Sequence, residues 1–170
     1  MKKTGLFLSI IALIVFSISC TKETVDEVAP LITTASMTAT VNDTAWTSVT
    51  RVTKNYTNLN TFVITGTSTD GKVIAVTVKG NEVGTYTSST SIDSASAQVG
   101  AIWKPSSSLN YVSKNGNVKI TDINTTDLRI SGTFSFEVVN SSDLNDSFEI
   151  TSGKFENVKY SVSDSSKVGN

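Results

Sequence analysis

The sequence predicts an all-β domain, an antiparallel meander that forms a β-sandwich or a partly open β-barrel. Three observations support this prediction. Short runs of alternating apolar and polar residues follow one another along most of the chain. Turn residues separate these runs at intervals of about 8 to 12 residues. No stretch of the domain has the 3.6-residue apolar spacing of a soluble amphipathic helix. Because short turns join consecutive strands, a meander is favoured over a Greek key.

Residues 1–19 have the composition of a bacterial export signal. Lys2 and Lys3 supply the positive start, and an apolar run from Leu6 to Ile18 follows. A run of about 13 residues suits a signal peptide and is shorter than the roughly 20 that a permanent membrane span needs. The only cysteine, Cys20, directly follows a small residue at the end of this run. This position predicts cleavage before Cys20 and its lipidation, and an ordinary secretory signal with an incidental cysteine is the alternative.

Residues 20–35 are predicted to form a flexible tether, because they carry charged residues and few large apolar ones. We therefore expect a lipoprotein of the cell envelope, held in the lipid bilayer of the outer membrane through acylated Cys20. Acidic residues soon after Cys20 resemble a signal that directs some lipoproteins to the cell surface. A merely soluble tether explains them equally well, so the periplasmic and the surface-exposed face both stay open.

Cleavage before Cys20 leaves 170 − 19 = 151 residues, the size of one domain. We expect residues 36–163 to be folded and residues 164–170 to form a disordered tail. Without Lys2 and Lys3 the chain has 12 basic and 15 acidic side chains, a net charge of −3. This balance argues against a nucleic-acid partner, which requires a basic stripe.

The first half of the domain predicts short strands, namely 37–41, 46–52, 62–67 and 72–78. Asn42-Asp43-Thr44 turns the first strand into the second. Ser68 to Gly71 forms a hairpin in which the glycine takes a positive φ.

The second half predicts further strands, namely 97–103, 109–113, 118–120, 128–138, 148–150 and 155–162. Asn115-Gly116 is the strongest short hairpin signal and is expected to join two of them. The polar stretch 88–97 is expected to be a loop. The apolar residues change from odd to even positions after Phe155, which predicts a bulge near Glu156-Asn157.

The clearest strand is 128–138, in which even-numbered residues are apolar and odd-numbered ones mostly polar. Such alternation is typical of a sheet with one buried and one wet face. Gly132, midway along this strand, leaves room for a bulge or for a neighbouring aromatic ring.

Four phrases of the sequence carry a family resemblance: Met37 to Trp46, Gly84-Thr85-Tyr86, Gly132 to Phe136, and Gly153-Lys154-Phe155. They resemble the A-x-V-N-G-x-x-W opening, the glycine–tyrosine step, the G-T-F-S-F strand and the terminal G-x-F of a family of small Bacteroidota lipoproteins catalogued as a domain of unknown function. Asp43 stands where the family usually has glycine. The resemblance covers most of residues 37–160. It implies an all-β lipoprotein of no assigned activity and adds no catalytic residues.

The residue types argue against an enzyme. The chain has no histidine, the commonest general base and zinc ligand, and its one cysteine is assigned to lipid. It also lacks a nucleophile elbow and a phosphate-binding glycine loop. A carboxylate pair for glycoside hydrolysis is the remaining alternative, with Glu137 and Glu149 as candidates. We expect no catalytic residue and no cofactor.

Two weaker patterns concern metal binding and modification. Asp143, Asn145 and Ser147 alternate ahead of Glu149 and faintly resemble a calcium loop, but the required glycine is missing. A plain polar hairpin is the preferred interpretation, and no metal site is expected. Asp-Thr-Ala and Asp-Ser-Ala phrases match an O-glycosylation pattern of Bacteroidota, which makes Thr44 and Ser94 candidate glycosylation sites.

Trp103, Tyr86 and Tyr111 are the candidate ligand-binding residues. Aromatic side chains form sugar-stacking platforms on many extracellular β-domains, but a domain of this size also buries large aromatics in its core. Trp46 opens a strand after a turn and is expected in the core. Trp103 lies beside Pro105 and suits either role.

These observations favour a non-catalytic envelope lipoprotein that binds a protein or a glycan through loops or one sheet face. The alternative is a lipocalin-like carrier whose barrel encloses a small apolar ligand. The two differ in what fills the barrel. Ile130, Phe134 and Phe136 on the inward face favour a packed core, whereas a carrier needs smaller side chains and a cavity.

Overall fold

The structure, a computed structural model, describes residues 34–88 and 98–164. The predicted signal peptide, the lipidation of Cys20, most of the tether, Ser94 and residues 165–170 of the tail lie outside the described residues. So do residues 89–97 of the loop predicted at 88–97, whereas Ser88 ends a strand. No helix among the described residues has the length and hydropathy that a bilayer crossing requires.

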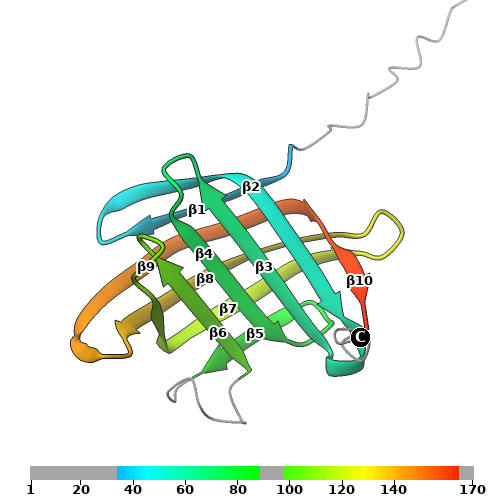
Figure 1. The fold of residues 1–170 in the computed structure, drawn as a ribbon. Helices are drawn as coiled ribbons and strands as arrows, with labels where there is room; N and C mark the ends of the chain where they lie inside the picture. Colours follow the sequence, from blue (N-terminus) through cyan, green and yellow to red (C-terminus); the bar gives the residue numbers. More distant parts are fainter. Residues whose placement is uncertain (1–33, 89–97, 165–170) are drawn as a thin grey trace, which may run out of the picture. The chain divides into compact units, whose positions relative to one another are not determined.

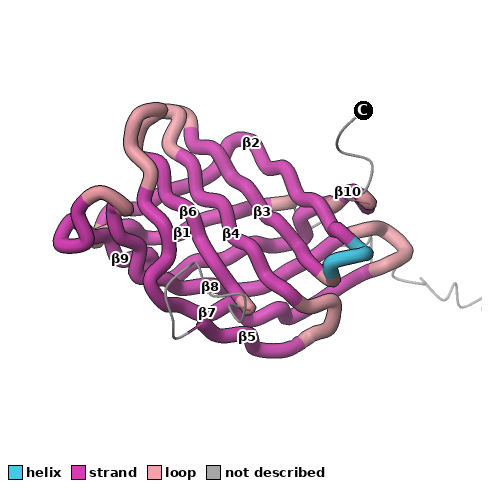
Figure 2. The backbone as a smooth tube through the Cα atoms, turned by 60° about the horizontal axis from the view of Figure 1, so that its bottom comes forward, coloured by secondary structure: helices cyan, strands magenta, loops and turns pink. Residues whose placement is uncertain are grey.

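Strands make up most of the described chain, with one short 3-10 turn, η1 (Thr57–Leu59) (Figures 1 and 2). The ten strands of the described residues are β1 (Ser36–Val41), β2 (Thr44–Tyr56), β3 (Thr61–Ser68), β4 (Val73–Lys79), β5 (Gly84–Ser88), β6 (Val99–Lys104), β7 (Tyr111–Asn124), β8 (Arg129–Asn140), β9 (Asp143–Lys159) and β10 (Ser161–Ser163). The all-β prediction is confirmed.

Eight strands close into a barrel. β1, β2, β3, β4, β6, β7, β8 and β9 pair antiparallel in that order, and β9 returns to pair with β1. The predicted antiparallel meander is therefore confirmed. Because the last strand of the path pairs with the first, the fold is a barrel rather than a sandwich (Figure 1).

The short strands β5 and β10 pair with the parts of β7 and β2 that their longer neighbours leave unpaired. β6 pairs with β7 only at Ile102–Val112 and Trp103–Tyr111, and β5 then continues along β7. Along β2, β1 pairs with the beginning of the strand and β10 pairs, in parallel, with its end. Each short strand gives partners to an edge that would otherwise expose its backbone groups.

The inside of the barrel is packed with large side chains. Phe62, Phe155, Met37 and five isoleucines are fully buried, and Phe134 and Phe136 lie with them in one core cluster. Along β8 the predicted alternation is confirmed, because residues 130 to 138 are buried at every even position. Burial of this apolar surface supplies the main driving force for folding.

The prediction of a hairpin at Asn115-Gly116 is wrong. The chain passes through both residues as part of β7, where Asn115 lies opposite Glu137 and Gly116 opposite Phe136. Gly116 allows the ring of Phe136 on β8 to pack directly against the backbone of β7, because a Cβ at this position would overlap that ring. The glycine is therefore not part of a turn. The separate strands predicted at 109–113 and 118–120 are consequently one strand.

The bulge predicted near Glu156-Asn157 is confirmed. The register between β8 and β9 shifts there, and Asn157 has a φ of 50°. A second bulge at Ser152, also with a φ of 50°, lies where the sequence predicted a break between two strands. β9 is continuous because each bulge absorbs one extra residue without ending the ladder.

Candidate ligand-binding site at the mouth of the barrel

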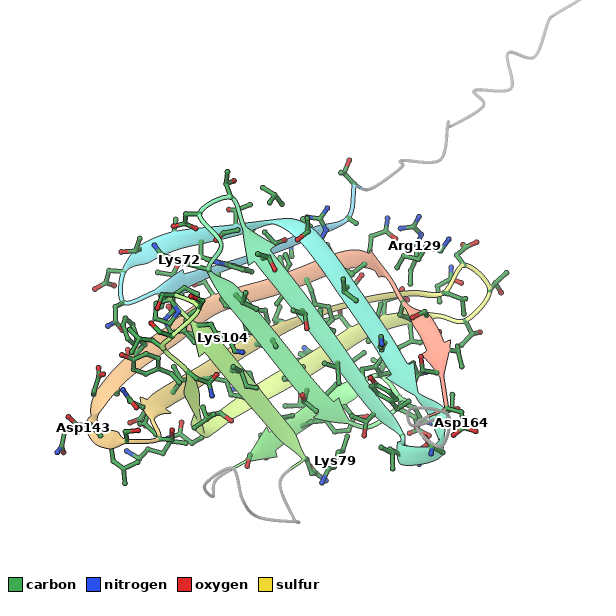
Figure 3. All side chains as sticks on the ribbon, viewed as in Figure 1. Lys72, Lys79, Lys104, Arg129, Asp143 and Asp164 are labelled. Carbon is green, nitrogen blue, oxygen red and sulfur yellow. The ribbon has the colours of Figure 1, made fainter. Side chains whose placement is uncertain are left out.

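A cavity of about 470 Å³ opens at one end of the barrel. Its walls come from the β1–β2 turn, the β3–β4 hairpin, the end of β6 with the residue after it, and β9. Figure 3 labels Lys72 on the β3–β4 hairpin and Lys104 at the end of β6, both at this end of the barrel. Alternate connections of a meander meet at the same end, so the fold itself gathers these segments.

Aromatic rings form the floor of the cavity. Trp46, Trp103 and Phe148 line it together with Pro105. Trp103 and Phe148 meet edge to face, with ring centroids 6.3 Å apart. The Nε1 of Trp46 donates to the carbonyl oxygen of Lys72 at 3.4 Å. Such contacts hold the rings in defined positions beneath the opening.

Both tryptophans are largely covered by their neighbours. Trp46 is 5% exposed and Trp103 is 3% exposed, so the core position expected for Trp46 is confirmed and Trp103 has the same character. The indole N–H of Trp103 has no hydrogen-bond partner among the described residues. An unpaired buried donor costs roughly 1–3 kcal/mol, which an acceptor brought to this position would offset.

Polar side chains form the rim. Lys72 Nζ lies 2.8 Å from Asp70 Oδ2, and the Ser68 hydroxyl also donates to Asp70. These hydrogen bonds, from Lys72 first and Ser68 second, lower the pKa of Asp70 to about 2. Gly71 has a φ of 80°, which confirms the predicted hairpin with its positive-φ glycine. The rim therefore carries a fixed pair of opposite charges at neutral pH.

The β1–β2 turn is hydrogen-bonded to the neighbouring strand β9. Asn42 Oδ1 accepts a hydrogen bond from the backbone N–H of Glu149 at 2.7 Å. Asn42 and Asp43 have φ values of 41° and 61°, so both central residues of the turn are left-handed, as in a type I′ hairpin. Asp43 fits this turn without a glycine because aspartate tolerates the left-handed conformation. Thr44, the candidate glycosylation site, is exposed on the same rim.

The structure brings together two of the three predicted ligand-binding aromatics. Trp103 and Tyr111 are register partners on β6 and β7, and both contact Phe148. Trp103 lines the cavity, while Tyr111 lies behind Phe148 and is buried. Tyr86 lies on β5 opposite Val118, outside the cavity lining, and its hydroxyl donates to the carbonyl of Glu82.

Tyr111 is held by a carboxylate. Its hydroxyl donates to Asp146 Oδ2 at 2.6 Å, and Asn140 also donates to Asp146. The hydrogen bond to Asp146, followed by burial, raises the pKa of Tyr111 above its ordinary value. Tyr111 thus stays a protonated donor, and its ring packs edge to face against Phe148 with the ring centroids 4.8 Å apart.

Sequence reasoning did not identify Phe148, Asp70 or Lys72 as part of a site. Asp70 stood out only as a turn residue, and Lys72 and Phe148 only as the first residues of strands. Their grouping depends on which hairpins share an end of the barrel. The predicted meander contained this signal, because every second connection must lie at the same end.

The two candidate catalytic carboxylates lie elsewhere. Glu137 and Glu149 are register partners on β8 and β9 and line a shallower groove of about 260 Å³. Glu137 accepts hydrogen bonds from Lys114 at 2.8 Å and Asn115 at 2.7 Å, which lower its pKa. A glycosidase acid needs a raised pKa, so Glu137 has the opposite property.

The segment that resembled a calcium loop lies at the beginning of β9. Asp143 Oδ1 accepts a hydrogen bond from the backbone N–H of Asn145 at 3.1 Å, an arrangement typical of Asx turns. Within residues 34–88 and 98–164, no cluster of three or more acidic, cysteine or histidine side chains could hold a metal ion.

Comparison with known families identifies the fold unit. Residues 33–159 match the family described as Domain of unknown function (DUF6252). The chain belongs to this family. The match covers the DUF6252 barrel from the start of β1 to the end of β9, which confirms the resemblance to a domain of unknown function. Neither a curated protein nor a solved structure matches the chain.

Proposed function

We propose that this DUF6252 domain is the binding module of a lipid-anchored cell-envelope protein, and that it binds a saccharide unit of a glycan at the mouth of its barrel without catalysing a reaction. The cavity with an aromatic floor and a polar rim is the observation that carries this proposal. Its volume of about 470 Å³ falls in the usual range of small-molecule sites.

The chemistry of the walls suits a sugar ring. One face of a sugar presents C–H groups, which pack well against aromatic side chains such as Trp46, Trp103 and Phe148. Its hydroxyl groups both donate and accept hydrogen bonds. Asp70 provides an acceptor and Lys72 a donor at the rim. Opposite charges fixed side by side favour a neutral polyhydroxylated ligand over an ion of either sign.

The ionisation of Asp70 supports binding rather than catalysis. Asp70 is the acidic side chain among the residues that line the cavity, and its pKa is lowered to about 2. It therefore stays deprotonated at neutral pH and cannot donate the proton that a glycosidic leaving group needs.

The contents of the barrel weigh against the carrier function. Ile130, Phe134 and Phe136 point inward, and each is at most 3% exposed. A lipocalin-like carrier holds its ligand inside the barrel, where these side chains are packed. The mouth of the barrel is the better candidate for a ligand.

The anchoring part of the proposal rests on the sequence. Lys2 and Lys3, the apolar run and the position of Cys20 are typical of a lipoprotein signal. Expression with a labelled fatty acid should give labelled protein, and Cys20→Ser should abolish the label. Label that persists in the Cys20→Ser chain, or an uncleaved leader, would contradict the anchor.

Ligand binding can be read from the two tryptophans, since both line the cavity. Titration with a panel of neutral oligosaccharides should change the tryptophan emission for at least one of them. Asp70→Asn with Lys72→Met should weaken that binding at least about tenfold, as expected when two hydrogen-bonding partners are lost. Asp127→Asn, in the β7–β8 turn, is the control and should bind like the parent. Equal affinity in both variants would reject the site.

A further inference from the structure

Among four neighbouring strands, three carry basic side chains and none carries an acidic one. β2, β3, β4 and β6 lie side by side in the barrel. Their sequences contain Arg51, Lys54, Lys79 and Lys104 but neither aspartate nor glutamate. β7, β8 and β9 mix both signs. Arg51 is half-buried and is the register partner of buried Gly66, so the exposed cations of these strands are Lys54, Lys79 and Lys104.

The outward side chains of these strands form a continuous grid of register partners, all at least partly exposed. We call the following twelve residues the basic face: Lys54, Val63, Thr77 and Gly100 in one row, Val52, Thr65, Ala75 and Ile102 in the middle row, and Thr50, Thr67, Val73 and Lys104 in the third. The centre of the basic face consists of hydroxyl and aliphatic groups, with a lysine at two of its corners. Val52 is 59% exposed and Ile102 is 37% exposed.

This composition fits a flat anionic surface made of lipid headgroups. A lysine can lay its methylene stem along the surface while its ammonium group meets a phosphate. Exposed aliphatic side chains between the lysines reach the boundary between headgroups and acyl chains. The absence of carboxylates from the four described strands removes the repulsion that would oppose such contact.

The point at which the chain enters the barrel supports the same partner. β1 begins at Ser36 and pairs with β2, the first strand of the basic face. Fifteen residues separate Ser36 from Cys20, the proposed lipid attachment site. That length reaches at most about 50 Å. A bilayer held within this distance meets the basic face at a high effective concentration.

We propose that the basic face docks on an anionic lipid bilayer, the membrane to which the proposed lipid anchor attaches the chain. The strands then lie along the bilayer plane, and the mouth of the barrel opens sideways and stays accessible to a ligand. The biological setting rests on the proposed lipid anchor. The contact itself does not, so a chain without lipid still binds.

The test uses the chain from Thr21 to Asn170, which carries no lipid. Every residue of the described hydrophobic core lies between Met37 and Tyr160, so this chain keeps the whole core. It should sediment with vesicles of equal parts phosphatidylcholine and phosphatidylglycerol, but not with phosphatidylcholine alone. Binding should weaken as salt rises from about 0.05 to about 0.5 M. Lys54→Gln with Lys104→Gln should weaken it about fivefold per lysine.

A matched control removes the same charge from the other side of the barrel. Lys119→Gln with Lys159→Gln changes exposed lysines of β7 and β9 and should bind like the parent. Val52→Ser with Ile102→Ser should weaken binding while leaving its salt dependence intact. Equal losses in the two lysine pairs, or no binding to mixed vesicles, would overturn the proposal. Tighter binding to soluble polyglutamate than to vesicles would indicate an acidic protein partner instead. Fatty-acid labelling tests the anchor separately.

Discussion

Gly132 and Phe155 lie opposite each other on β8 and β9, and the phenyl ring of Phe155 covers the glycine. A Cβ added at Gly132 would lie 2.4 Å from the backbone carbonyl oxygen of Lys119 and 2.5 Å from Phe155 Cζ. Phe136 covers Gly116 and Phe134 covers Gly153 in the same way, again between register partners. Three phenylalanines therefore enter the core of a narrow barrel because glycine on the facing strand leaves room for each ring.

Gly132→Ala should lower the free energy of unfolding by about 1–3 kcal/mol, the usual cost of overpacking a well-filled core. Urea denaturation measures the difference. Gly100→Ala is the control, because a Cβ there would meet nothing closer than Ser113 Oγ at 3.5 Å. If Gly132→Ala unfolds at the same urea concentration as Gly100→Ala, the packing of the Phe155 ring and the Lys119 carbonyl against residue 132 does not require a glycine.

The Asp70–Lys72 pair should make stability depend on pH in acid. The pKa of Asp70 is lowered from 3.8 to about 2, so its ionised form stabilises the folded state above pH 3.8 and this contribution is lost as the pH falls through about 2. The melting temperature of the parent should exceed that of Asp70→Asn at neutral pH. The difference between the two melting temperatures should narrow as the pH falls from 3.8 to about 2. NMR titration of the Asp70 carboxyl reads the pKa directly.

Lys72→Met serves as the control for that titration. Lys72 is the largest cause of the lowered pKa, so its removal should return the pKa of Asp70 toward its ordinary value. An unchanged pKa in Lys72→Met would show that the ion pair does not act on Asp70.

Asp146→Asn should lower the pKa of Tyr111. The hydrogen bond to Asp146 is the largest cause that raises this pKa, and an amide accepts a hydrogen bond less strongly than a carboxylate. Because the folded-state pKa is raised, Tyr111 adds stability below its ordinary pKa and loses that contribution as the pH rises through the folded value. Ultraviolet absorption of tyrosinate follows the titration, and Tyr111→Phe identifies its signal. A titration curve identical in parent and Asp146→Asn would contradict the pairing.

Iodide should quench the tryptophan emission of the folded chain only weakly. Trp46 and Trp103 are 5% and 3% exposed, so a bulky hydrated anion meets little of either indole. Unfolding in urea should restore strong quenching, and single Trp→Phe variants assign the signal to each residue. Strong quenching of Trp103 in the folded chain would show that it forms an open platform rather than a covered cavity floor.

Several features of the fold follow from the sequence alone. Period-two alternation over 128–138 predicted a strand with one buried face, and turn residues between short apolar runs predicted an antiparallel meander. The change from odd to even apolar positions after Phe155 located a bulge. These features are local, because each depends on residues that are near neighbours in the chain.

Asn115-Gly116 shows where local reasoning fails. The dipeptide has the composition of a hairpin turn, yet the ring of Phe136 on the next strand decides its conformation. The pairing of the whole segment with β8 outweighs the turn preference of two residues. No pattern within 111–120 contains this information, because Phe136 lies 20 residues away.

By itself, the sequence determined the all-β class, the order of most strands and the alternation that fills the core. Only the tertiary structure decided that the meander closes into a barrel, that Trp103 and Phe148 line one cavity with the Asp70–Lys72 pair, and that Lys54 and Lys104 lie on one face. The physical reason is register: strand pairing sets which distant side chains become neighbours, and it follows from the packing of the whole barrel rather than from any one segment.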